Sequence, residues 1–147
     1  MFRVLIAAFL LAASLRAEAF DAAPPPEVAP PKPFFTGNNA HKYLGYAALA
    51  TAVLAGLAPK EEGGLHEYAG YASGAFGIAA TASGIAYHHD DIHPGYGFKD
   101  PDNLHALLGA TGAILMAAGL SSAPDGSHAG PASAGAGLML LSLYFVW

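Results

Sequence analysis

The chain has 147 residues, enough for one domain, and 54% of them are apolar while only 12% are charged. A mean hydropathy of +0.38 is high for a soluble protein of this size and favours a bilayer as the solvent. The net charge of −5, without any cluster of Lys or Arg, excludes a nucleic-acid partner. The lack of cysteine excludes disulfides, thiolate metal sites, iron–sulfur clusters and covalently attached haem.

Residues 1–19 have the parts of a secretory signal peptide. Arg3 is the positive n-region, an apolar run follows from Val4 to Leu15, and residues 17–19 (Ala-Glu-Ala) match an A-x-A cleavage site. An uncleaved anchor helix is the alternative, and either interpretation exports the N-terminus. Residues 20–39 are rich in Pro and Ala, a composition that favours an extended, exported tether over a packed element.

Residues 40–147 contain four apolar segments, each of about 17 to 22 residues, separated by Pro- and Gly-containing gaps. About 20 helical residues cross a hydrocarbon core about 30 Å thick. Small residues dominate the segments, which lack the charged face that a soluble bundle would need. We therefore predict an all-α, integral membrane four-helix bundle of up-down topology, in the inner membrane with the N-terminus on the periplasmic or outer side. The segments are 41–57, 66–87, 104–120 and 128–147.

Four of the seven histidines stand one per segment, at or near its start: His41, His66, His105 and His128. In an alternating bundle the first and third helices begin at one membrane face, and the second and fourth at the other. His41 is therefore expected to face His105 at the outer side, and His66 to face His128 at the inner side. Two imidazoles on opposite sides of a porphyrin are what a six-coordinate b-type haem requires, so the pattern predicts two haems b.

A small residue follows each of these histidines four positions later: Gly45, Gly70, Gly109 and Ala132. Position i+4 lies on the same helical face, so the glycines are expected to leave room for the macrocycle. Pro131 fits best in the first turn of a helix, which would place His128 just before the fourth helix. Interfacial anchoring is the alternative role for a histidine at a helix end.

Four successive helices with a histidine pair at each membrane face resemble the core of the cytochrome b561 family, transmembrane di-haem electron carriers. The resemblance covers residues 40–147, without the flanking helices common in that family. It implies that His41 with His105, and His66 with His128, are the axial ligands of two haems b that move electrons across or along the membrane. It also implies a quinol, ascorbate or another cytochrome as donor or acceptor. Any enzyme of this kind would be an oxidoreductase.

The connection between the second and third segments, residues 87–100, is the longest and most polar. His88, His89 and His93 stand there beside aspartates, and this set of side chains would suit zinc, copper or nickel. A solvated loop, or a docking surface for an electron-transfer partner, is the alternative. A metal-ion-binding membrane protein and a non-catalytic structural subunit of a larger complex therefore stand beside the electron carrier as alternative functions.

Overall fold

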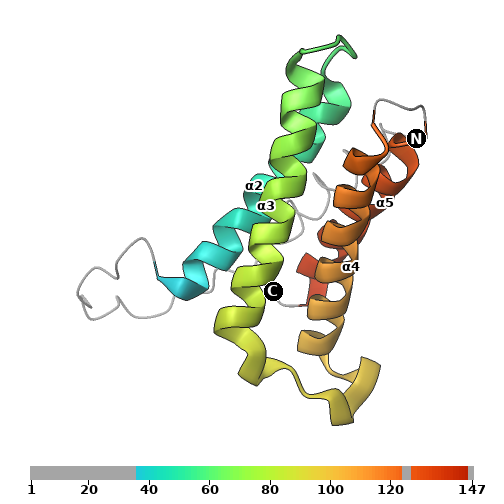
Figure 1. The fold of residues 1–147 in the computed structure, drawn as a ribbon. Helices are drawn as coiled ribbons and strands as arrows, with labels where there is room; N and C mark the ends of the chain where they lie inside the picture. Colours follow the sequence, from blue (N-terminus) through green and yellow to red (C-terminus); the bar gives the residue numbers. More distant parts are fainter. Residues whose placement is uncertain (1–35, 124–126, 146–147) are drawn as a thin grey trace, which may run out of the picture. The chain divides into compact units, whose positions relative to one another are not determined.

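The computed structural model describes residues 36–123 and 127–145, and this part of the chain is helical without any strand. The predicted all-α fold is thus confirmed. The predicted signal peptide, and the predicted tether up to residue 35, lie outside the described residues. The described residues form four α-helices, with two 3-10 turns between α3 and α4 and one after α5 (Figure 1). In chain order the elements are α2 (Gly37–Leu57), α3 (Leu65–His88), η1 (His89–Asp91), η2 (Pro94–Lys99), α4 (Pro101–Ser121), α5 (Ala129–Ser142) and η3 (Leu143–Phe145).

Local capping chemistry sets the helix ends. The side chain of Thr36 accepts a hydrogen bond from the backbone N–H of Asn39 at 3.3 Å, so α2 begins at Gly37, inside the predicted tether. Oδ1 of Asp100 accepts from the backbone N–H of Asp102 at 2.9 Å, and Pro101 occupies the first position of α4. These caps fix where each helix starts, and so how far each histidine lies from the end of the bundle.

The helices form two antiparallel hairpins. α2 packs along α3, and α4 packs along α5 (Figure 1). The two hairpins meet chiefly through α3 and α4, with a smaller contact between α2 and α5. Going round the bundle, the order is therefore α2, α3, α4, α5, which leaves α2 with α4, and α3 with α5, as the two diagonal pairs.

Small residues bring the second hairpin together closely. A Cβ atom on Gly112 of α4 would stand 2.6 Å from the backbone oxygen of Gly135 on α5, so the two backbones nearly touch. Beside this crossing, Met116 and Met139 are buried together with Ala48 from α2. The described core is thus built from alanine, glycine and methionine, which lets the helices approach each other.

One described helix, α4, is long and apolar enough to cross a membrane, and only 22% of its most apolar stretch is buried inside the protein. The apolar helix Ala129–Phe145 is shorter. By length and hydropathy, therefore, one of the four predicted membrane-spanning segments meets the requirement on its own.

Candidate histidine-pair sites

The structure brings His41 and His105 together at one end of the bundle. His41 lies in the second turn of α2, and His105 lies in the second turn of α4. Their Nε2 atoms are 3.4 Å apart, their ring centroids are 5.7 Å apart, and the ring planes stand at 78°. We refer to these two residues as the 41/105 pair.

His66 and His128 lie together at the other end, and we refer to them as the 66/128 pair. Their ring centroids are 6.0 Å apart and their planes stand at 63°. His128 is the N-cap residue of α5, and Pro131 falls in the first turn of that helix. The position just before the helix therefore still lets the side chain of His128 reach His66.

Each pair connects helices that are diagonal in the bundle, α2 with α4 and α3 with α5. The imidazoles of each pair therefore meet across the middle of the bundle. Along α3, His66 is 14 residues from Ala80, whose carbonyl contacts His41. At 1.5 Å per residue, the two pairs are separated by about 21 Å along the bundle.

The second ring nitrogen of three of these histidines is bound to the neighbouring helix of the same hairpin. Because a carbonyl oxygen can only accept, Nδ1 carries the proton in each case, and in the neutral ring Nε2 keeps the lone pair. The Nδ1 bonds run from His41 to the oxygen of Ala80 at 2.7 Å, from His66 to that of Ala55 at 2.8 Å, and from His105 to that of Ser142 at 3.1 Å.

These three carbonyls are accessible for different local reasons. The residue four places after Ala55 is Pro59, which has no N–H to give to that oxygen. Ser142 is the last residue of α5, where the final carbonyls have no partner within the helix. Ala80 lies inside α3, but the residue four places later is Gly84, which has no side chain to cover the oxygen.

The arrangement has a chemical consequence for the 41/105 pair. With both Nδ1 atoms donating to carbonyls, the two neutral rings direct lone pairs at each other across 3.4 Å. Two acceptors cannot bond to one another, so this geometry suits an electrophile held between them. Two imidazole nitrogens on opposite sides of one metal, each about 2.0–2.1 Å from it, stand about 4 Å apart. A separation of the two rings by about 0.6 Å would therefore accommodate such a metal.

The ring of His41 fits against α3 at a glycine that the sequence analysis did not single out. A Cβ atom on Gly84 would stand 2.8 Å from Nδ1 and Cε1 of His41, too close for a real side chain. One turn further along α3, the ring centroid of His88 is 5.5 Å from that of His41. His88, predicted as a loop residue, thus ends α3 and lies beside the 41/105 pair. The sequence does carry a signal for this position of His88. It follows His66 by 22 residues, and a helix of that length reaches from one end of the hairpin to the other.

The glycines expected to make room for a macrocycle differ in their surroundings. A Cβ on Gly45 would meet nothing within 4 Å. A Cβ on Gly70 would stand 3.4 Å from the side chain of Leu120, and one on Gly109 would stand 3.6 Å from Oγ of Ser142. Space beside the histidine is therefore open at Gly45, whereas the other two glycines face side chains of neighbouring helices.

The loop histidines do not converge on one point. Within residues 36–123 and 127–145, no group of three or more His, Asp or Glu side chains is placed to hold a metal ion. Each loop histidine pairs with a different aspartate: His88 with Asp91 at 3.1 Å, His89 with Asp90 at 3.1 Å and His93 with Asp100 at 3.6 Å.

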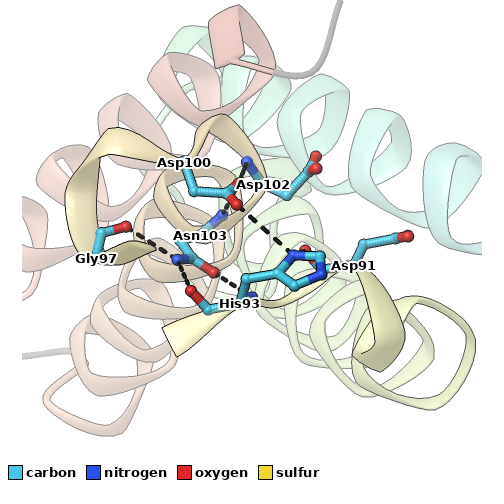
Figure 2. Close-up of polar contacts among 6 residues, drawn as sticks. All are labelled: Asp91, His93, Gly97, Asp100, Asp102 and Asn103. Carbon is cyan, nitrogen blue, oxygen red and sulfur yellow. Dashed lines mark hydrogen bonds and ion pairs between the residues drawn. The ribbon is translucent and has the colours of Figure 1, made fainter. Parts of the chain in front are cut away.

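Asn103, in the first turn of α4, fixes the second half of this loop (Figure 2). Its Oδ1 accepts from the backbone N–H of His93 at 2.9 Å. Its Nδ2 donates to the backbone oxygens of His93 at 2.7 Å and of Gly97 at 2.9 Å. The loop is therefore tied to the helix that carries His105, two residues further along.

Comparisons of the chain with protein-family models, with curated proteins and with solved structures found no significant match.

Proposed function

We propose that this chain is a membrane electron-transfer protein that holds two b-type haems, one at each end of a four-helix bundle. The observation that carries the proposal is the 41/105 pair, in which two imidazoles are fixed by their Nδ1 atoms and present Nε2 to each other. The 66/128 pair brings two more imidazoles together at the opposite end, where Nδ1 of His66 is bound to the oxygen of Ala55. A single pair would be an isolated polar contact. Two pairs, one at each end, would give two haem positions between which an electron could move along the bundle.

In this proposal His41 with His105 would hold one haem through their ring nitrogens, and His66 with His128 would hold the other. Bound haem iron would supply the one-electron chemistry. The chain's own contribution is to fix the imidazoles, because a carbonyl that accepts from Nδ1 sets the ring direction and raises the basicity of Nε2. Quinols, ascorbate and other cytochromes are the proposed classes of donor and acceptor, reached directly or within a larger complex.

The placement of the aromatic residues supports a membrane around this bundle. Tyr is enriched where a protein meets the two membrane surfaces. Six of the seven tyrosines lie within two turns of a helix end or in a connection, whereas Tyr46 lies at the middle of α2. Each is at least 36% exposed: Tyr43, Tyr46, Tyr68, Tyr71, Tyr87, Tyr96 and Tyr144. Between these ends, apolar side chains such as Ile78 and Ile114 point outward at 45% and 61% exposure, as contact with lipid requires.

The helix lengths agree with the same placement. α2 has 21 residues and α3 has 24. At 1.5 Å per residue these helices are about 31 and 36 Å long, and a hydrocarbon core is about 30 Å thick. α4, the described helix that is both long and apolar enough to cross a membrane, has few fully buried residues and would lie against lipid.

The haem proposal is tested by the reduced-minus-oxidised spectrum of the purified full-length protein, with haem quantified as the pyridine haemochrome. We expect a sharp b-type α-band and two haems per chain. His41→Ala and His66→Ala should each remove one of them, because each breaks one pair. His89→Ala is the matched control, since His89 pairs with Asp90 in the loop. A colourless protein, or loss of haem in the control, would contradict the proposal.

The membrane topology is tested by single cysteines, which are unique labels because the chain has none of its own. Asp90→Cys lies in the α3–α4 connection, and Glu61→Cys lies in the α2–α3 connection. An impermeant maleimide should label the first in intact cells and the second only after permeabilisation. Labelling of both from one side would refute four spanning helices.

A further inference from the structure

The ring of His41 lies against three residues of α3 that are spaced four apart and so share one face: Ala80, Gly84 and His88. The carbonyl of Ala80 accepts the Nδ1 proton at 2.7 Å. Gly84 leaves the space that the ring fills. The ring of His88 stands next, with its centroid 5.5 Å from that of His41 and its plane tilted by 58°. Three consecutive turns of α3 therefore define where this imidazole lies.

His88 is itself held in place. Its Nδ1 donates to Oδ2 of Asp91 at 3.1 Å, and its side chain is 32% exposed. The adjacent His89 is different, because its side chain is 66% exposed and pairs with Asp90 on the surface of the loop. His88 thus turns toward the bundle, whereas its neighbour turns toward solvent.

Within residues 36–123 and 127–145, the other end of the same hairpin places no third ring against His66, whose ring contact is with His128. His66 is bound through Ala55 of α2, and the residues four and eight places after Ala55 are Pro59 and Gly63. Both residues lie beyond the end of α2 at Leu57, so α2 has no further turn that could place a ring beside His66 as α3 places His88 beside His41. The two ends of the hairpin therefore share the carbonyl bond to the histidine but differ in the third contact.

We propose that His88 is a positioning residue that fixes the rotation of the His41 ring, and so makes the 41/105 site electronically distinct from the 66/128 site. The inference rests on the proposed function, because it concerns an axial ligand of haem. Rotation about the Cβ–Cγ bond of His41 would change the angle of 78° between the rings of the 41/105 pair. That angle sets how the iron d orbitals split. Near-perpendicular imidazoles give a strongly anisotropic low-spin ferric EPR signal, and near-parallel ones give a rhombic signal.

The test compares EPR spectra of the oxidised, haem-loaded full-length protein with those of three variants. His88→Ala removes the ring, and we expect one of the two low-spin signals, about half of the total intensity, to move toward the rhombic type. His88→Phe keeps a ring against His41 without the bond to Asp91, and should retain the wild-type signal. His89→Ala should leave both signals unchanged.

The outcomes separate this inference from the proposed function. A wild-type protein without haem overturns both. Two haems in the wild type and an unchanged spectrum in His88→Ala overturn the positioning role alone, as does a His88→Phe spectrum that shifts as far as that of His88→Ala. If His88→Ala loses the haem of the 41/105 site, recovery of that haem in His88→Phe supports the inference, and its loss in both variants overturns it.

Discussion

Gly84 offers the sharpest test of how the protein orients an imidazole. Gly84→Ala adds one methyl group at a position where a Cβ atom would stand 2.8 Å from the ring of His41. Ordinary contact begins near 3.4 Å, so the ring would have to retreat by about 0.6 Å. The substitution should not destabilise α3 itself, because Ala is about 1 kcal/mol more favourable than Gly inside a helix.

The size of the effect follows from the bond that the retreat would break. The Nδ1 of His41 lies 2.7 Å from the oxygen of Ala80, and such bonds weaken beyond about 3.2 Å. Losing a typical hydrogen bond costs about 0.5–1.5 kcal/mol. Because about 1.4 kcal/mol is a factor of ten in affinity, haem at the 41/105 site should bind roughly two- to twelvefold more weakly.

The assay is a titration of haem into the haem-depleted Gly84→Ala protein, followed by its low-spin optical bands. We expect one binding step to weaken and the other to stay as in the wild type. Gly137→Ala is the matched control, since a Cβ at Gly137 in α5 would meet nothing within 4 Å. Unchanged affinity at both steps, or equal weakening of both, would refute the argument that α3 orients His41.

Three further changes probe other contacts. Pro59→Ala supplies a backbone N–H that competes with His66 for the Ala55 carbonyl. The haem retained at the 66/128 site after dilution should therefore fall a few-fold, while the 41/105 site keeps its haem. Equal loss at both sites would contradict this. Gly135→Leu adds a side chain where a Cβ alone would contact the backbone oxygen of Gly112 and stand 2.7 Å from the backbone nitrogen of Met116, both in α4. The free energy of unfolding should fall by about 1–3 kcal/mol, which a lower thermal midpoint would show, and an unchanged midpoint would argue against close packing. Asn103→Ala removes three hydrogen bonds, so limited proteolysis should cut residues 92–99 faster while haem content stays constant.

The sequence predicted the helices well because their ends depend on local signals. The predicted segments 41–57, 66–87 and 104–120 fall within helices that extend each of them by at most four residues at an end. Caps such as Thr36 and Asp100 account for the earlier starts of α2 and α4. The fourth segment was predicted to run to residue 147, and α5 ends at Ser142 before a 3-10 turn.

The meeting of His41 with His105, and of His66 with His128, also followed from the sequence, because alternation of short-looped helices places their starts at alternate ends. The backbone oxygens that accept the Nδ1 protons of these histidines were not predicted. Pro59 marks the free carbonyl of Ala55, but nothing in the sequence marks that of Ala80. This oxygen accepts from His41, and also from Oγ of Ser83 at 2.9 Å, because α2 packs where Gly84 leaves room for the imidazole.

The contacts within each hairpin and those between the two hairpins have different effects on the two histidine pairs. His41, His66 and His105 are each bound by a carbonyl of the partner helix in their own hairpin, so folding of a hairpin already orients its imidazoles. Each pair is then completed across the gap between hairpins, whose direct contact is chiefly that of α3 with α4. A group bound between the imidazoles would therefore add its binding free energy to the association of the hairpins rather than to the helices themselves. The orientation of the nitrogens and the spacing between them are thus controlled by different parts of the fold.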